Sequence, residues 1–311
     1  MFSVVTGGAG FIGSHLVDAI VAQGDEVLVI DSLTAGKREN IARHLDAGDA
    51  RLLVHDLCCD GWQEALAGAA RVYHLAADPD VRQSALDPGP VIQNNIMATC
   101  RVLEAMRAAG VPEVVFTSTS TVYGDATVIP TPEDYAPLEP ISVYGASKLA
   151  CEALISSYCH SFGMRSWVFR FANIIGERSG HGVITDFVRK FKKDPSELEI
   201  LGDGRQTKSY LEVHECVASM LFAAGHVGGP VNIFNIGSED GIDVRSIAEI
   251  VAAEMHLPAV RYRYTGGERG WVGDVPRMQL ALAKIKALGW RPNLGSRESV
   301  KIAVRAVLDG S

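Results

Sequence analysis

The sequence lacks the features typical of membrane, secreted or nucleic-acid-binding proteins. It has no apolar stretch of about 18 or more residues, which a spanning helix needs. Its N-terminus runs directly into an apolar strand without the basic and apolar regions of a signal peptide. The formal net charge of −8, from 29 Lys and Arg against 37 Asp and Glu, argues against a general nucleic-acid binder. We therefore expect a cytoplasmic protein with no membrane or nucleic-acid partner.

Cysteines are few, and no two form a Cys-x-x-Cys pair among the six. The neighbours Cys58 and Cys59 are poorly placed to bridge each other. Reduced thiols that mostly pack in a core are therefore expected rather than a redox or metal site, and no metal is expected.

The first half of the chain alternates short apolar runs with longer helical patterns. The clearest helical pattern covers 91–109, where apolar residues recur at spacings near three and four before Gly110 and Pro112. Such alternation predicts an α/β fold, a Rossmann-type doubly wound parallel sheet with helices on both faces. The expected strands are Ser3–Thr6, Val27–Ile30, Leu52–Val54, Val72–Leu75, Val114–Thr117 and Trp167–Arg170.

After about Asn173 the pattern loosens, which predicts a smaller, interleaved C-terminal lobe. A strand-like run at 231–236 should return to the main sheet, and an apolar helix is expected at 244–255. We expect a Rossmann domain over 1–173 plus roughly 209–237, and a substrate-binding lobe over 174–208 and 238–311.

A glycine-rich turn, Gly7-Gly8-Ala9-Gly10-Phe11-Ile12-Gly13, follows the first expected strand and opens a helix that runs to Gln23. Glycines in this pattern allow a tight turn, close approach to a pyrophosphate, and packing of the helix on the strand. The helix N-terminus then offers N–H groups to phosphate. Asp31, at the end of the second strand, can accept hydrogen bonds from a ribose diol, which favours NAD over NADP. Alternatively, Asp31 is a simple turn residue.

A tyrosine and a lysine four residues apart, Tyr144 and Lys148, begin a further expected helix and share one of its faces. A phenol with a pKa of about 10 is a poor base near neutrality, but a neighbouring ammonium and the positive ring of NAD⁺ favour the phenolate. Tyr144 could then remove a proton from a hydroxyl while hydride leaves the same carbon. By itself the pair could equally be an exposed helical pair without chemistry.

A run of hydroxyl residues from Thr117 to Thr121 favours the chemical interpretation, because it ends an expected strand. Ligands bind at that edge of an open parallel sheet, and a hydroxyl there can relay a proton. Taken alone, the run could be a strand that ends in small polar turn residues.

Together these residues resemble the extended short-chain dehydrogenase/reductases, and within them the UDP-glucose 4-epimerase-like nucleotide-sugar enzymes. The resemblance covers nearly the whole chain. It implies NAD as the cofactor, Tyr144 as the base, Lys148 as its support and Thr119 in the family's Ser/Thr role. It is carried by the glycine turn, Asp31, Asp56-Leu57, His74–Ala77, Asn94-Asn95, the 117–124 stretch, Tyr144–Lys148, Arg170–Asn173, the segment from Gly202-Asp203-Gly204 to Tyr210, and 269–274.

The resemblance also assigns the remaining site residues by position. The implied cofactor-binding residues are Gly7, Gly10, Phe11, Ile12, Gly13, Asp31, Ser32, Asp56, Leu57, Leu75, Ala76, Ala77, Asn95, Thr117, Tyr144, Lys148 and Phe171. The implied substrate-binding residues are Ser120, Thr121, Tyr144, Asn173, Val183, Lys208, Tyr210, Arg269 and Asp274.

The sequence departs from the family pattern in informative places. Related dehydratases and decarboxylases carry acids where this chain has Ser120 and Thr121, which cannot supply a further proton transfer well. The family's Arg-Asp pair is here Lys208 and Ser209, so a point charge replaces a bidentate fork. Trp271 holds the place of a later arginine, whose role we assign to Arg269; the indole could stack on a base or simply pack.

These observations favour an NAD-dependent nucleotide-sugar 4-epimerase of galactose metabolism. It would most simply interconvert UDP-glucose and UDP-galactose, or their N-acetyl derivatives, through a transient 4-keto sugar. A net NAD(H)-dependent oxidoreductase of a nucleotide-linked sugar, or a non-catalytic NAD-sensing protein, are alternatives. By family analogy we expect a homodimer that pairs helices 91–109 and 147–162, although each could bury its stripe within one subunit. The sugar itself stays open.

Overall fold

The computed structural model describes residues 1–271 and 273–310. The chain divides into two compact units. The first comprises Met1–Val122, Ser142–Arg170 and Val217–Phe234, and the second Tyr123–Ile141, Phe171–Cys216 and Asn235–Ser311. Residues 123–141 thus group with the second unit, whereas the sequence placed them in the Rossmann domain. The expected domain boundaries stay a prediction.

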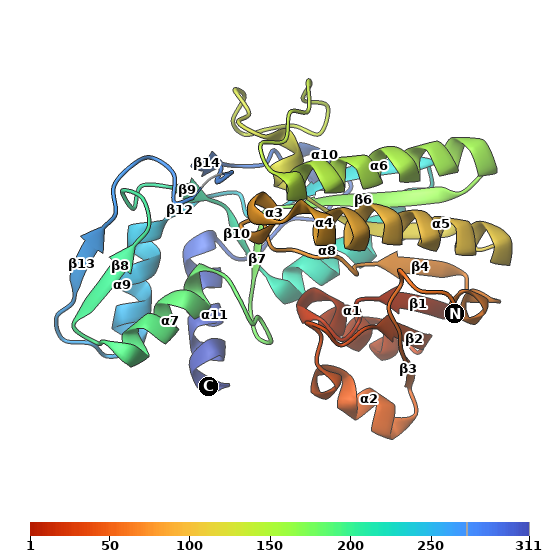
Figure 1. Cartoon of the computed structure of the whole chain (residues 1–311), viewed down its shortest axis with the longest axis horizontal. Coiled ribbons are helices and arrows are strands. Elements are labelled where there is room, and N and C mark those ends of the chain that lie inside the picture. The colour runs from red at the N-terminus through yellow and green to blue at the C-terminus, as the bar shows by residue number, and fades with distance from the viewer. Residues whose placement is uncertain (272, 311) are drawn as a thin grey trace. The chain divides into compact units, whose positions relative to one another are not determined.

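A seven-stranded parallel sheet with the order β11-β6-β5-β4-β1-β2-β3 forms the centre of the first unit (Figure 1). Strand β1 pairs in parallel with β2 on one side and β4 on the other, so that Val4 lies opposite both Leu28 and Val72. This arrangement confirms the expected Rossmann-type fold. The strands are β1 (Phe2–Thr6), β2 (Glu26–Asp31), β3 (Ala50–Val54), β4 (Arg71–His74), β5 (Glu113–Thr119), β6 (Arg165–Phe171) and β11 (Val231–Ile236).

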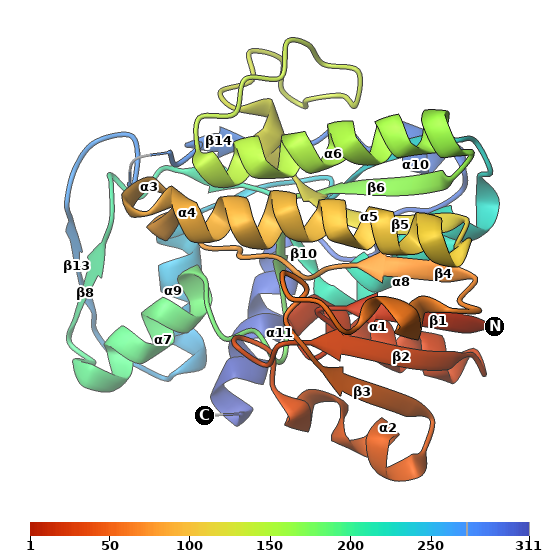
Figure 2. The same cartoon turned by 45° about the vertical axis from the view of Figure 1, so that its right-hand side comes forward.

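Helices α5 and α6 run side by side in this unit (Figure 2). Their buried side chains, such as Met106 and Ile155, share one apolar core with strand residues such as Val114 and Val168. The helical segments that begin or lie in this unit are α1 (Phe11–Ala22), η1 (Arg38–Ile41), α2 (Ala42–Ala47), η2 (Gln63–Leu66), α3 (Gln83–Leu86), α4 (Pro88–Val91), η3 (Ile92–Met97), α5 (Ala98–Ala109), η4 (Ser120–Tyr123), α6 (Val143–Phe162) and α8 (Val213–His226).

A single α-helix was expected over 91–109, but a π-helical segment interrupts it. It consists of α4, a π-helical segment η3 and α5. The end is as expected, since Gly110 follows α5 with a φ of +70°. A π-helical segment inside a helix is rare and often marks a functional site.

The second unit has short strands and its own apolar core. Strands β7 and β10 pair in parallel, β9 lies between β12 and β14, and β8 pairs with β13. Buried residues of α7, α9 and α11, such as Phe187, Ile247 and Val300, form the core. The elements are β7 (Asn173–Ile175), α7 (Val183–Lys193), β8 (Glu197–Ile200), β9 (Thr207–Lys208), β10 (Tyr210–Glu212), β12 (Ile242–Asp243), α9 (Val244–Glu254), β13 (Arg261–Tyr264), β14 (Arg277–Met278), α10 (Ala283–Ala287) and α11 (Ser296–Asp309).

The cysteines agree with the sequence-based expectation. All six are thiols rather than disulfides, and Cys151, Cys159 and Cys216 are buried. Within the described residues, none of the helices has the length and apolar character needed to cross a bilayer.

Candidate active site

The glycine turn between β1 and α1 requires glycine at two positions. Gly7 has a φ of +70°, and a Cβ there would lie 2.7 Å from the main-chain nitrogen of Ala76. A Cβ on Gly13 would lie 2.1 Å from the carbonyl oxygen of Gly7. The first turn of α1 therefore packs directly on the preceding loop, as the glycine pattern predicts.

Helix α1 begins in a way that suits a diphosphate. Among the described residues, no side chain caps its N-terminus at Gly10, and no acid occupies its first turn. Unsatisfied N–H groups and the positive end of the helix dipole attract an anion at such a site. The main chain at Gly10, Phe11 and Ile12 thus fits the pyrophosphate of NAD.

Asp31 is held firmly at the carboxyl end of β2. Its carboxylate oxygens accept hydrogen bonds from the N–H groups of Ala9 at 2.9 Å and Leu33 at 2.8 Å. A Cβ on Gly36 would lie 2.8 Å from both oxygens, so the carboxylate is closely enclosed. Each oxygen can accept a further hydrogen bond, so Asp31 fits a ribose diol and would repel a 2′-phosphate. Ser32 follows it and donates its hydroxyl to Thr34 at 3.0 Å.

The loops after β3 and β4 carry the other expected cofactor residues of this unit. Asp56 accepts the N–H of Cys58 at 2.8 Å, and Leu57 is buried. Leu75 and Ala76 lie against Gly7, as the close approach above requires, and Ala77 comes next in the chain.

Asn95, in the π-helical segment, uses its whole side-chain amide on protein partners. Its oxygen accepts the N–H of Asp78 at 2.7 Å, and its nitrogen donates to the carbonyl of Asp78 at 3.2 Å and the hydroxyl of Ser147 at 2.9 Å. Asn95 therefore fixes the loop after β4 to α6. Its contact with the cofactor stays a prediction.

Tyr144 lies in the first turn of α6, which Ser142 caps by accepting the N–H of Gly145 at 3.0 Å. The hydroxyl of Thr119, at the end of β5, lies close enough to the phenol to lower its pKa. The oxygen of Thr119 accepts hydrogen bonds from the N–H and hydroxyl of Thr121, at 3.2 and 3.1 Å. The sequence-predicted catalytic Tyr144 and Thr119 are thus neighbours.

Burial raises the pKa of Tyr144 to about 12, and the hydrogen bond with Thr119 acts in the opposite direction. The protein groups alone therefore keep the phenol protonated near neutrality. Its ionisation depends on a further positive charge, such as that of the NAD⁺ ring.

Lys148 is almost completely buried, with 3% of its surface exposed. Its Nζ donates to the carbonyl of Thr117 at 2.9 Å and lies 4.7 Å from the ring centre of Phe116. Burial lowers the pKa of Lys148 to about 8. His74 is buried nearby; burial and then Lys148 lower its pKa to about 3, so the imidazole is neutral at physiological pH.

The carboxyl end of β5 continues into η4, which carries the expected substrate residue Ser120. Ser120 is buried, and Thr121 follows it with its hydroxyl bonded to Thr119. Phe171, expected at the cofactor, is buried at the end of β6.

In the second unit, three of the expected substrate residues converge. Lys208 forms an ion pair with the buried Asp274 at 2.6 Å, and its ammonium lies 5.3 Å from the ring centre of Trp271. Arg269 donates to the carbonyl of Asp274 and pairs with Asp125 at 2.7 Å. Both cations thus have protein carboxylate partners, which the sequence did not predict.

Strands β7 and β10 carry two more expected substrate residues, with Asn173 directly opposite Tyr210 in the ladder. The side-chain amide of Asn173 donates to the carbonyl of Ser209 at 3.2 Å, and the Tyr210 side chain is buried. Val183 begins α7 and packs against the apolar core that includes Tyr210.

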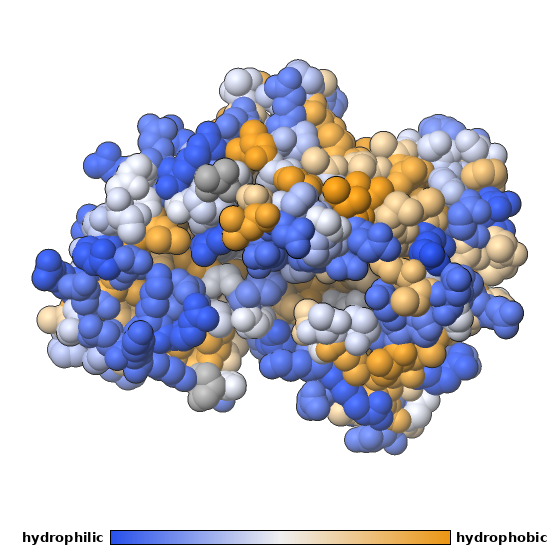
Figure 3. Space-filling model, viewed as in Figure 1, coloured by the Kyte–Doolittle hydropathy of each residue, from blue (hydrophilic) through white to orange (hydrophobic). Residues whose placement is uncertain are grey.

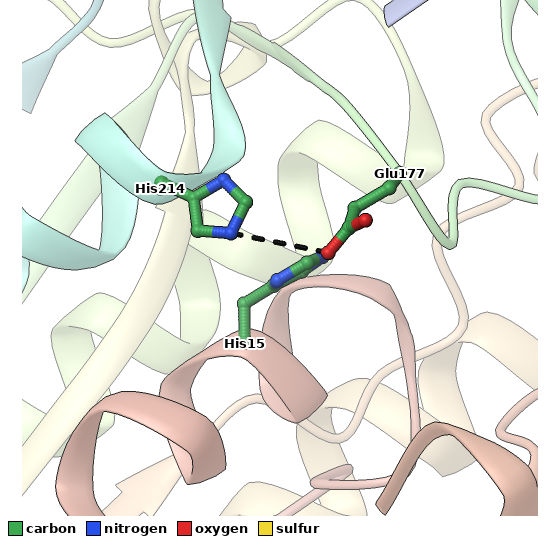
Figure 4. Close-up of side chains that lie close together, drawn as sticks. All are labelled: His15, Glu177 and His214. Carbon is green, nitrogen blue, oxygen red and sulfur yellow. Dashed lines mark ion pairs between the residues drawn. The ribbon is translucent and has the colours of Figure 1, made fainter. Parts of the chain in front are cut away.

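A histidine beside two glutamates lies near the same strands. His214 bonds Glu212 through Nδ1 at 2.9 Å. Its Nε2 lies 3.9 Å from a carboxylate oxygen of Glu177 (Figure 4). Its side chain is 64% exposed, so these ion pairs contribute little to stability.

The sequence analysis missed a buried charge pair next to Lys148, formed by Glu152 and Arg170 at 2.7 Å. The signal was present, because Glu152 follows Lys148 by four residues and so shares its helix face. A glutamate at that spacing does not by itself distinguish a buried partner from a solvent-exposed one.

Comparisons with known proteins agree with this architecture. A model of the NAD dependent epimerase/dehydratase family matches residues 3–237. A putative UDP-glucose 4-epimerase of Methanocaldococcus jannaschii is 32% identical over 306 residues, which cover 97% of this chain and 96% of that protein. UDP-glucuronic acid decarboxylase 4 of Arabidopsis thaliana is 30% identical over 313 residues, covering 97% of this chain and 67% of that protein.

A crystal structure of a UDP-galactose 4-epimerase is 43% identical, with a TM-score of 0.90 and coverage of 100% of this chain and 99% of that one. The family, the enzyme class and the NAD cofactor expected from the sequence are confirmed. This chain belongs to the NAD dependent epimerase/dehydratase family, within the extended short-chain dehydrogenase/reductases.

Proposed function

We propose that the protein is a UDP-sugar 4-epimerase that interconverts UDP-glucose and UDP-galactose or their N-acetyl derivatives. The observation that carries this proposal is the placement of Thr119 next to Tyr144, with the buried Lys148 bonded to the carbonyl of Thr117, at the carboxyl end of β5. It supplies a proton acceptor, a proton relay and a fixed cation at the edge of a parallel sheet where ligands bind.

The chemistry that NAD supplies when bound is reversible hydride transfer. The role of the protein is to move the proton: Tyr144 accepts it from a sugar hydroxyl, and Thr119 steadies the phenolate by donating its own hydroxyl proton. Lys148 stabilises the same phenolate by its charge and binds the nicotinamide ribose. A proton taken and returned at one oxygen suffices for epimerisation and needs no second acid.

The residues next to Thr119 favour epimerisation over elimination or decarboxylation. Ser120 and Thr121 are hydroxyl residues, and the Thr121 hydroxyl is already bonded to Thr119. Neither side chain is an acid at neutral pH. An elimination or a decarboxylation, which needs a further proton transfer, therefore lacks a proton donor at these positions. The name of the decarboxylase relative nevertheless makes UDP-glucuronic acid a necessary member of a substrate panel.

We propose that the second unit holds the UDP-sugar through Asn173, Val183, Tyr210 and the group formed by Lys208, Arg269 and Asp274. Asp274 fixes Lys208 in one position and offsets part of its charge. A phosphate would therefore meet a pre-oriented ammonium, since ordering the side chain costs nothing more on binding. We further propose a homodimer that acts in the cytoplasm.

The purified protein is expected to convert UDP-glucose to UDP-galactose without added NADH, because the cofactor is regenerated in each cycle. Products from UDP-glucose, UDP-N-acetylglucosamine and UDP-glucuronic acid would be separated by chromatography. Stoichiometric consumption of added NADH would instead indicate a net oxidoreductase. Lack of turnover with every nucleotide sugar would refute the proposal.

A further inference from the structure

One carboxylate joins three elements of the first unit just beyond the catalytic lysine. Glu152 of α6 accepts hydrogen bonds from Arg170 of β6, from Nη2 at 2.7 Å and from Nε at 3.1 Å. Ser118 of β5 donates its hydroxyl to the same carboxylate at 2.5 Å. Glu152 and Arg170 are nearly excluded from solvent, with 6% and 3% of their surfaces exposed.

Lys148 joins α6 to β5 one turn earlier. Its ammonium donates to the carbonyl of Thr117, the residue immediately before Ser118. Because residues four apart share a helix face, Lys148 and Glu152 bond consecutive residues of the strand. These contacts fix the helix that carries Tyr144 against the strand that carries Thr119.

A buried ammonium needs a negative neighbour, because burial favours the neutral amine. The titratable groups that act on Lys148 are Cys151 and Glu152 of α6 and His74 of β4, and Tyr144 lies one turn before it on α6. Burial raises the pKa of the Cys151 thiol and of Tyr144 and lowers that of His74, so all three are neutral at pH 7. Among these described neighbours, Glu152 is the one carboxylate.

We propose that Glu152, held by Ser118 and Arg170, is a positioning residue whose negative charge keeps Lys148 in its ammonium form beside the catalytic tyrosine. This inference rests on the proposed function for its catalytic meaning. An ion pair of this kind is not required for stability, since apolar residues of similar volume often stabilise a core equally well. Packing alone therefore does not explain why a carboxylate occupies position 152.

The proposal predicts the direction of a measurable shift. Burial lowers the pKa of Lys148 to about 8, and Cys151 and then Glu152 oppose that lowering. Replacing Glu152 with Gln removes the opposing charge and leaves the positive Arg170 nearby, so the pKa of Lys148 falls further. Lys148 then loses its proton at lower pH, and the alkaline limb of the kcat/KM profile moves down by about 1 pH unit or more.

The decisive measurement is an NMR titration of [ε-¹³C]lysine-labelled protein, with the Lys148 signal assigned from a Lys148→Arg variant. It needs neither substrate nor turnover. The pKa of Lys148 should fall in Glu152→Gln and return toward the wild-type value in Glu152→Asp. Glu249→Gln, which removes one exposed carboxylate from α9, is the control and should leave both the pKa and the activity profile unchanged.

Loss of one partner of a buried ion pair can prevent folding, so a double variant, Glu152→Gln with Arg170→Met, is measured in parallel. Its Lys148 pKa should also fall, but by less, because the repulsion from Arg170 is gone. An unchanged Lys148 pKa in either folded variant overturns the inference. If wild-type protein turns over no nucleotide sugar, the proposed function fails, while the titration still decides the role of Glu152.

Discussion

At the scale of single residues, burial shifts the pKa values of two side chains of the site in opposite directions. Burial raises the pKa of Tyr144 to about 12 and lowers that of Lys148 to about 8. Both shifts disfavour the charged form. Under the proposed mechanism, the Tyr144 phenolate therefore depends on the positive charges of Lys148 and the bound cofactor.

Tyr144→Phe should lower kcat by about 10²- to 10⁴-fold, the usual contribution of a positioned acid–base group. The ring still fills its place on α6, so NAD content and melting temperature should stay near the wild-type values. Steady-state kinetics and the absorbance of released cofactor would measure both. Tyr158→Phe, on the same helix but bonded to Glu104, is the matched control and should keep its activity. Full kcat in Tyr144→Phe would contradict the role of Tyr144 as the base.

The sequence predicted part of this residue-level arrangement. Tyr144, Lys148 and Thr119 were predicted together, and the fixed spacing of a helix explains why the first two share a face. The partners of Lys208 and Arg269 were not predicted, because they lie far away in the sequence. Asp274 is 66 positions from Lys208, and Asp125 is 144 positions from Arg269. Such pairings carry no local periodicity.

At the scale of elements, every strand expected in the first half is present, with ends that differ by at most two residues from those expected. Short β-branched runs between helical patterns leave few alternatives to a parallel sheet. The π-helical segment escaped prediction because the apolar stripe of 91–109 continues through it. What distinguishes it is the set of hydrogen bonds that Asn95 makes with Asp78 and Ser147.

Asn95→Ala is expected to reduce the free energy of unfolding by about 2–4 kcal/mol, because it removes two part-buried hydrogen bonds with Asp78 and a buried one with Ser147. Urea denaturation followed by circular dichroism would measure the change. Gln93→Ala, in the same segment but exposed, should cost less than about 0.5 kcal/mol. Equal effects of the two substitutions would mean that the Asn95 bonds do not hold the segment.

At the scale of the whole molecule, the sequence indicated a large sheet followed by a looser lobe but could not follow the chain between them. The chain passes between the two units several times, and 123–141 belongs with the second by its contacts. One contact of this segment within the second unit is made by Tyr123, whose hydroxyl donates to Asn235, 112 positions away, at 2.7 Å. Composition changes little at such crossings, so a sequence pattern does not reveal them.

The surface of α4 to α6 bears on the expected homodimer. Figure 3 shows apolar residues over these helices, and Ile92, Met97 and Phe162 are 45%, 44% and 51% exposed. Grouped apolar exposure of this kind is typical of an interface. We therefore predict that light scattering after size exclusion will give twice the mass of one chain.

Combining Ile92→Glu with Met97→Glu should yield the monomer, because pairing about a two-fold axis would bury two new like charges from each subunit. Val128→Lys is the control, since Val128 is 51% exposed on the 123–141 segment, away from these helices in sequence. It should leave the mass unchanged. A wild-type monomer at micromolar concentration, or a dimer that survives both charges, would contradict pairing through α4 to α6. In that case the apolar stripe of α5 would serve only the core that it shares with α6.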